Sequence, residues 1–333
     1  MAASRVSLRA RRPPLGAGRR LPGPGRPLRS LCAAAGLASV LAGCGLGAGA
    51  APTAVKLTVT REFGAAVVRA YSTPKVSGQE TIMSLLMRNA TVATRYGGGF
   101  VQSVDGISGG NAGGQPVAWF YFVNGIQAPK GAAETNVHPG DHVWWDWHDW
   151  SQAESIPAVV GSYPEPFLNG ISGKRYPVRV ECATSSEAAC QTVTSRLRAA
   201  GVPAAIGGFG SGAEPETLRV AVGLWDVVGG EPITHTIDTG PQTSGVYARF
   251  SPDGKTLTLL DAEGRVARTF TAGTGLIAAT TSGEYAPVWV VTGTDAAGVE
   301  RAADALDGTA LHDRFAAVLG PEGDVFSAPA PGS

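Results

Sequence analysis

The chain has 333 residues, enough for two domains, and its 46 glycines and 23 prolines favour turn-rich β structure over long helices. Its formal charge of zero hides an asymmetry. Eight of the 27 basic residues precede residue 45, where no acidic residue occurs, so the rest carries 19 basic against 27 acidic side chains. An acidic mature chain lacks the clustered Lys and Arg that phosphate binding needs, which argues against nucleic acid as a partner.

The N-terminus predicts a lipoprotein signal peptide over residues 1–43. Arginines lead into the apolar run Leu31–Ala42, which is too short to span a bilayer. The run ends in Leu-Ala-Gly-Cys44, which resembles a bacterial lipobox. The resemblance implies that Cys44 becomes the lipidated first residue, with its acyl chains in the lipid bilayer. An ordinary exported protein with a chance cysteine here is the alternative.

This N-terminus predicts a protein on the extracytoplasmic face of the cell membrane. Residues 44–54, which are mostly small, are then expected to form a tether between the lipid and the folded part.

Residues 55–150 are predicted to form the first domain. The strands Val55–Thr60 and Ala66–Tyr71 precede a helix that begins at a capping box, in which Ser77 is followed three residues later by Glu80. The strand Phe100–Val104 comes next. An aromatic run then ends in Asn124-Gly125, the strongest short-range signal for a hairpin.

The last strand of this domain, from His142 to Trp150, alternates between two faces. Val143, Trp145 and Trp147 form the face expected in the core, whereas the other face mixes two indoles with two ionisable groups. Such a mixture is typical of a binding surface. With two residues of the aromatic strand, the predicted ligand-binding residues are Trp119, Tyr121, Trp144, Asp146, His148 and Trp150. Packing of Trp144 and Trp150 against the linker or the second domain is an equal alternative.

The order of two strands, one helix and three further strands is that of a β-grasp module. The strings Gly99–Ile107 and Ala118–Gly125, and Pro139-Gly-Asp141 before a Trp-bearing strand, resemble the transcobalamin C-terminal-like domain of unknown function. The resemblance covers residues 55–150. It implies a β-grasp fold and the binding of a corrinoid-like ligand or another partner, in the service of a membrane importer such as one of the energy-coupling factor type.

Residues 151–174, rich in proline and glycine, predict a linker or an extended arm. A mixed α/β domain is expected over residues 175–320, with strands at Pro177–Cys182, Leu218–Val222 and Pro287–Val291 and helices after the first and the last of them. The fold class is therefore α+β, an N-terminal β-grasp domain followed by a mixed α/β domain. Residues 296–319 are expected to be helical with a break near Gly308, and residues 321–333 to be a disordered tail.

Four cysteines occur in the chain, and the first two are assigned to the signal peptide and the lipid anchor. Cys182 and Cys190 remain, and in an oxidising compartment we expect them to form a disulfide. A metal site built on this pair is a weak alternative, because no histidine is close in the sequence.

The histidines and aspartates between residues 138 and 149 have the composition of metal ligands. On a strand, however, His142 and His148 would lie about 20 Å apart, and Asp146 with His148 would need a third ligand from elsewhere. We expect an exposed carboxylate–imidazole pair, with no metal and no cofactor. Asp295, after an apolar strand, is expected to cap a helix rather than to help bind an anion.

No nucleophile with a neighbouring base stands out, so the sequence predicts a non-catalytic, lipid-anchored binding protein. A surface adhesion or scaffold module that binds protein or glycan is the alternative, and an enzyme housed in residues 174–320 is a third hypothesis.

Overall fold

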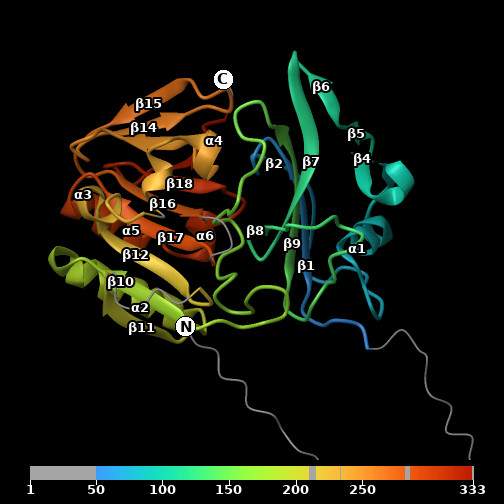
Figure 1. Cartoon of the computed structure of the whole chain (residues 1–333), viewed down its shortest axis with the longest axis horizontal. Coiled ribbons are helices and arrows are strands. Elements are labelled where there is room, and N and C mark those ends of the chain that lie inside the picture. Colours follow the sequence, from blue (N-terminus) through green and yellow to red (C-terminus); the bar gives the residue numbers. More distant parts are fainter. Residues whose placement is uncertain (1–49, 210–214, 233, 282–285, 332–333) are drawn as a thin grey trace, which may run out of the picture. The chain divides into compact units, whose positions relative to one another are not determined.

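A computed structural model describes residues 50–209, 215–232, 234–281 and 286–331, so the predicted signal peptide and Cys44 lie outside the described residues. Two large sheets dominate, one in residues 55–150 (the N-terminal region) and one in residues 175–331 (the C-terminal region) (Figure 1). The chain is α+β, as predicted, with more strand than helix. In the described part of the chain, no helix is both long and apolar enough to cross a membrane.

The N-terminal sheet has the strand order β2-β1-β9-β7-β6, with β8 paired to β7. Its strands are β1 (Lys56–Arg61), β2 (Ala66–Tyr71), β6 (Gly110–Ala112), β7 (Gln115–Val123), β8 (Ile126–Gln127) and β9 (His142–Asp149). β1 runs parallel to β9, whereas the other pairings are antiparallel. One face carries α1 (Ile82–Asn89) and a small sheet of β3 (Val92–Arg95), β4 (Phe100–Val104) and β5 (Ile107–Ser108) (Figure 1).

Two local signals in this region have different outcomes. The helix was expected to begin at Ser77, but its N-cap is Thr81, whose hydroxyl accepts the Ser84 N–H. Glu80 instead accepts bonds from the Ser77 amide and from Arg88, so the pair organises the approach to the helix. The hairpin after the aromatic strand is confirmed, because Asn124 and Gly125 have φ of 55° and 75° between β7 and β8.

The C-terminal sheet has the strand order β11-β10-β12-β17-β16-β18-β19. Its strands are β10 (Val178–Cys182), β11 (Ala204–Gly208), β12 (Leu218–Leu224), β16 (Gly275–Thr280), β17 (Val288–Gly293), β18 (Ala316–Leu319) and β19 (Val325–Ala328). The first four strands in the order are parallel, and the last three pair antiparallel. The central strands are buried on both faces, which explains their continuous apolar sequences.

Helices and a small antiparallel sheet accompany this sheet (Figure 1). One face packs against α2 (Glu187–Ala199) and α5 (Ala296–Asp304). The other face contributes to a core with the meander of β13 (Ala248–Phe250), β14 (Leu257–Leu260) and β15 (Val266–Phe270). Short helices complete the region: α3 (Trp225–Val228), α4 (Pro241–Ser244) and α6 (Gly308–Leu311).

Two predictions for the end of the chain need correction. The expected helices over residues 296–319, with their break near Gly308, are present as α5 and α6, but the segment ends in the apolar strand β18, which pairs with β16. The expected disordered tail contains β19, which pairs with β18, and Ala330 donates its amide to Leu260. This strand has only four residues, Val-Phe-Ser-Ala, too few for a clear pattern in the sequence. Besides its bonds to β18, it buries Ala328 and packs Phe326 against Phe270.

The predicted disulfide between Cys182 and Cys190 is present and joins the end of β10 to α2. Asp295 is also confirmed as an N-cap, since its side chain accepts the Gly298 N–H of α5 at 2.9 Å.

Residues 151–174 are not a free linker but an arm packed into the protein. Val159, Val160 and Phe167 are buried. The Val159 amide donates to Gly125 in the N-terminal region, and the Val160 amide donates to Phe315 in the C-terminal region. The arm therefore joins the two regions along its length, which agrees with the alternative of an extended arm.

Candidate functional site

The face of β9 that was predicted to bind a ligand is buried. Trp144 and Asp146 are 0% exposed and His148 is 2% exposed. The Trp144 ring lies 5.9 Å from Phe122 and 5.2 Å from Phe315, measured between ring centroids. The expectation of an exposed surface is therefore wrong for these three residues, because aromatic side chains of the C-terminal region supply the cover. The alternative, packing of Trp144 against the second domain, describes the structure.

The other predicted binding residues lie elsewhere. Trp119 and Tyr121 pair with Trp147 and Trp145 across β7 and β9, which places them on the opposite face of the sheet from Trp144. Trp150 lies just beyond β9, half-buried, and its amide donates to Pro116. The six predicted residues thus do not form one surface.

The carboxylate–imidazole pair of Asp146 and His148 is present, with 2.8 Å between Oδ1 and Nδ1. It is buried rather than exposed, because Phe63, Phe120 and Phe315 surround the imidazole. Among the described residues, no group of three or more His, Cys, Asp or Glu side chains is arranged to hold a metal ion.

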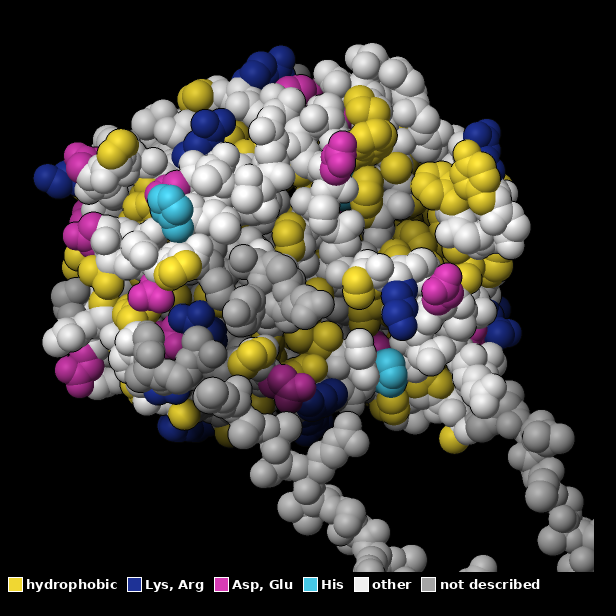
Figure 2. All heavy atoms as spheres, viewed as in Figure 1, with side chains coloured by type: hydrophobic (Ala, Val, Ile, Leu, Met, Phe, Trp, Pro, Cys, Tyr) yellow, Lys and Arg dark blue, Asp and Glu magenta, His cyan; other side chains and the backbone are white. Residues whose placement is uncertain are grey.

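A groove around β8 is the best candidate for a binding site. It consists of three pockets of about 220, 280 and 1040 Å³ that share Gln127 and Ala128. We call it the β8 groove. Hydrophobic side chains gather at the surface over β4 and β7 (Figure 2), and Phe100 of β4 lines the smallest pocket.

The smallest pocket is the aromatic end of the β8 groove, lined by Trp119, Tyr121 and Trp145. The Tyr121 and Trp145 rings lie 5.0 Å apart, and the Trp119 indole N–H donates to Ile107 at 2.9 Å. The Trp145 indole N–H is buried and has no acceptor in the part of the chain that the structure describes. Since a buried donor without a partner costs about 1–3 kcal/mol, this N–H is a natural anchor for an acceptor on a ligand.

The loop between β8 and β9 forms a wall of the groove and is fixed to its surroundings. The Tyr121 hydroxyl donates to the Lys130 carbonyl at 2.5 Å and lies 3.0 Å from the Thr135 hydroxyl. The Thr135 carbonyl in turn accepts the amide of Ile82, the first residue of α1. Burial raises the pKa of Tyr121, so its hydroxyl stays protonated and keeps this bond.

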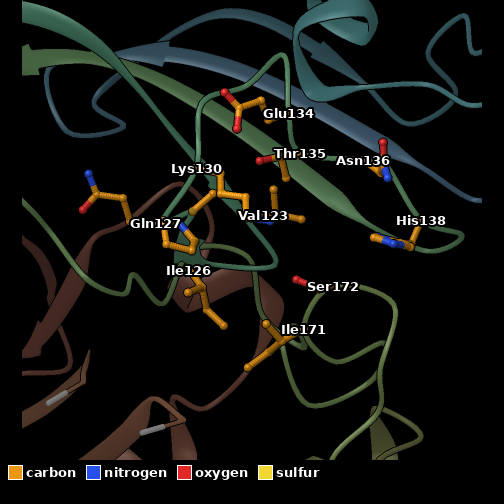
Figure 3. Close-up of a pocket in the computed structure, with 12 residues that line it drawn as sticks. Val123, Ile126, Gln127, Lys130, Glu134, Thr135, Asn136, His138, Ile171 and Ser172 are labelled. Carbon is orange, nitrogen blue, oxygen red and sulfur yellow. The ribbon is translucent and has the colours of Figure 1, made fainter. Parts of the chain in front are cut away.

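The 280 Å³ pocket is the polar end of the β8 groove. In Figure 3, Glu134, Thr135 and Asn136 lie on one side of it, and Ile126 and Ile171 lie on the other. This end can therefore hold a ligand that is polar on one side and apolar on the other.

His138 also lines the polar end, with Nδ1 3.4 Å from Oδ2 of Asp141. Burial raises the pKa of Asp141, which also accepts bonds from the His138 amide and from Asn124. The Asn124 side chain donates to Gly170 as well, so the arm is tied to the base of this pocket.

Comparison with known proteins finds a family that resembles part of the chain. Residues 79–149 match a domain of unknown function, DUF4430. The match covers the segment from the start of α1 to the end of β9, which carries the aromatic end of the groove and the loop that anchors it. No curated protein and no solved structure matches the chain.

Sequence reasoning singled out two of the aromatic residues that line the groove and missed Trp145. Trp119 and Tyr121 were among the predicted residues, whereas Trp145 was assigned to the core. That assignment is correct for its ring, which is 2% exposed, but it ignores the indole N–H. The signal that could have found it is the polar atom of Trp, because a buried indole ordinarily has a hydrogen-bond acceptor.

Proposed function

We propose that the chain is a non-catalytic, extracytoplasmic binding protein that is anchored through acyl chains on Cys44 and takes a small ligand in the β8 groove. The indole N–H of Trp145, buried between aromatic walls and without an acceptor among the described residues, is the observation that supports this proposal most directly.

The chemistry of the groove favours a flat, mainly apolar ligand with carbonyl or amide groups at its edge. The aromatic end supplies stacking surface from Trp119 and Tyr121, and the Trp145 N–H supplies one donor. The polar end adds Lys130, Glu134 and Asn136. A corrinoid-like molecule, an apolar ring system with peripheral amides, has these properties. The ligand would then pass to a membrane importer.

We also propose that the N-terminal region is a β-grasp domain, and the arrangement of its sheet supports this. Its first and last strands, β1 and β9, lie side by side and parallel in the middle of the sheet, and α1 covers one face. A parallel pair needs a long crossover connection, and residues 62–141, which contain the other elements of this region, supply it.

A fluorescence titration tests the ligand. Intrinsic tryptophan fluorescence of the protein is measured against cobalamin and cobinamide, for the wild type and for Trp145→Phe, which removes the N–H but keeps an aromatic ring. We expect saturable quenching by the wild type and an affinity at least about tenfold lower for Trp145→Phe, since a hydrogen bond from a buried donor is lost.

Trp225→Phe is the matched control, because Trp225 is buried against Phe250 in the C-terminal region. Its affinity should equal that of the wild type. Titrations that stay flat at high micromolar ligand remove the corrinoid proposal. Equal affinities for Trp145→Phe and Trp225→Phe contradict the assignment of the groove.

The anchor has its own test. Intact-mass analysis of the mature protein should find a diacylglycerol-modified N-terminus at Cys44, and Cys44→Ala should release the chain from the membrane fraction. An unmodified mature N-terminus would remove this part of the proposal.

One observation favours the alternative of an adhesion or scaffold module. Tyr96 is 85% exposed and Phe100 is 39% exposed, and their rings lie 6.3 Å apart at the turn between β3 and β4. Exposed aromatic rings of this kind suit a protein or glycan surface. A glycan array that is positive for the wild type and negative for Tyr96→Ala, together with flat ligand titrations, would favour this function.

A further inference from the structure

A further pocket, of about 270 Å³, lies outside the β8 groove and shares no lining residue with its three pockets. The turn between β1 and β2 contributes Glu62 and Phe63, and β9 contributes His148 and Asp149. The C-terminal region supplies Glu263 and residues 329–331. We call it the imidazole pocket.

The hydrogen bonds of Asp146 fix the tautomer of His148. The carboxylate of Asp146 accepts bonds from the Thr60 hydroxyl and from the amides of Phe63 and Gly64, at 2.5, 3.1 and 2.9 Å. Its fourth partner is Nδ1 of His148 at 2.8 Å. A carboxylate held by three donors is an acceptor, so Nδ1 is the ring nitrogen that donates to it, and a neutral imidazole in this orientation presents Nε2 as an acceptor.

The imidazole is held rigidly with this acceptor unused. His148 is stacked between Phe63 and Phe120, with ring centroids 4.6 and 4.4 Å away, and it lines the pocket although it is only 2% exposed. No described residue forms a hydrogen bond with Nε2. A ring nitrogen that is held at the wall of a pocket, with no partner among the described residues, can accept a hydrogen bond from a ligand.

Asp149 contributes a second unused acceptor. Its Oδ1 accepts the Ser151 N–H at 2.7 Å, whereas Oδ2 is buried and has no partner in the described part of the chain. Glu62 and Glu263 also line the pocket. Glu263 pairs with Arg265 at 2.9 Å and Glu62 lies 4.0 Å from Arg61. Of the carboxylates that line the pocket, that of Asp149 has no cationic partner among the described residues.

The residues that line the imidazole pocket, all of them described, include no Lys or Arg. The pocket therefore combines an unpaired carboxylate oxygen with an imidazole acceptor, next to apolar surface from Phe63, Trp147 and Pro329. A metal ion does not fit, because no three ligating side chains of the described residues come together. An ammonium group supplies several N–H donors and one positive charge, and an attached hydrocarbon would cover the apolar wall.

We propose that the imidazole pocket binds a small organic cation, a primary ammonium with an apolar body, through Asp149 and Nε2 of His148. The volume limits the ligand to the size of a small amine or an amino-acid side chain.

Calorimetric titration of the full chain with benzylammonium chloride tests the proposal, with benzyl alcohol as the uncharged ligand of the same shape. The wild type should bind the ammonium at least about tenfold more tightly than the alcohol, since hydrogen bonds between charged partners are the stronger ones. Asp149→Asn should weaken ammonium binding at least about tenfold. Asp226→Asn, at an exposed aspartate on α3, should leave it within about twofold.

Nitrogen-15 NMR of labelled histidine gives an independent readout. The wild type should show His148 protonated on Nδ1 and not on Nε2, and benzylammonium should shift the Nε2 resonance. The proposal is overturned by equal affinity for ammonium and alcohol, by absence of binding, or by unchanged affinity in Asp149→Asn. A proton on Nε2 in the free protein also overturns it. None of these results depends on the corrinoid titrations, so failure of one proposal leaves the other standing.

Discussion

Trp144 packs edge-on against Phe315, with ring centroids 5.2 Å apart at an interplanar angle of 78°. Trp144 lies in β9 of the N-terminal sheet, whereas Phe315 directly precedes β18 of the C-terminal sheet. The core around them takes side chains from both regions, from Phe63 to Ala328. This shared core makes one folding unit of two regions that the sequence presents as separate domains.

Phe315→Ala is expected to destabilise the whole protein by about 3–5 kcal/mol, since it removes a buried aromatic ring. Urea denaturation followed by fluorescence and by circular dichroism measures the loss, and both signals should move together in one transition. Val266→Ala, at a side chain that is 66% exposed, is the control and should stay within about 0.5 kcal/mol of the wild type. Two separate transitions in the wild type would contradict a shared core.

Gly64→Ala is expected to prevent folding or to cost more than about 3 kcal/mol. A Cβ at Gly64 would lie 1.8 Å from the Asp313 carbonyl oxygen, and the residue has φ of +87°. Gly97 has φ of +70°, but a Cβ there would meet no atom within 4 Å, so Gly97→Ala should cost only about 1–2 kcal/mol for the backbone conformation. Thermal unfolding of the two variants separates the clash of a Cβ with the Asp313 carbonyl from the strain of a positive φ. Equal losses of stability in the two variants would argue against the clash.

Acid should destabilise the protein through His142. Burial, together with the charges of Lys56 and His312, lowers its pKa to about 4, against about 6.5 in an unfolded chain. Between these values the unfolded chain binds a proton that the folded chain does not, so stability falls as the pH falls from 6.5 to 4. The full contribution is about 3 kcal/mol.

The comparison of wild type with His142→Gln isolates this effect. Glutamine keeps a polar partner for the Thr58 hydroxyl, which lies 2.8 Å from Nε2 of His142. Burial raises the pKa of Asp141 and of Glu165, and these groups act with the opposite sign, because they hold protons more tightly in the folded state. The free energies of unfolding of the wild type and His142→Gln should converge between pH 7 and pH 4, as the wild type loses stability. A constant difference between them would count against the lowered pKa of His142.

The disulfide between Cys182 and Cys190 closes a short loop, with a separation of 8 residues, so it should contribute only about 2–3 kcal/mol. Replacing both cysteines with alanine should lower stability by this amount and leave the transition cooperative. Reductant should lower the stability of the wild type but not of the double variant. A double variant that does not fold would mean that the bridge does more than restrict the unfolded chain.

Local patterns in the sequence predicted local features well. The alternation of β9, the Asn124-Gly125 hairpin, the Asp295 cap and the disulfide all depend on residues close in sequence or on simple counting. The helix start was misplaced by four residues, because Ser77 and Glu80 satisfy each other whether or not a helix begins there.

Features that depend on distant segments could not be predicted. The polar face of β9 looks exposed until Phe315, 171 residues from Trp144, is known to cover it. Strand β19 is only four residues long, and it is defined by its pairing with β18 and its packing against distant residues such as Phe270. The β8 groove and the imidazole pocket likewise take their walls from segments that only the tertiary fold brings together.

The shared core also sets the order in which the protein can be completed during synthesis. A ribosome releases Trp144 and its aromatic neighbours well before Phe315 and β18 have emerged. In that interval the rings that will form the core face water on the growing chain, which makes this stretch the natural place for a chaperone to bind and for aggregation to start.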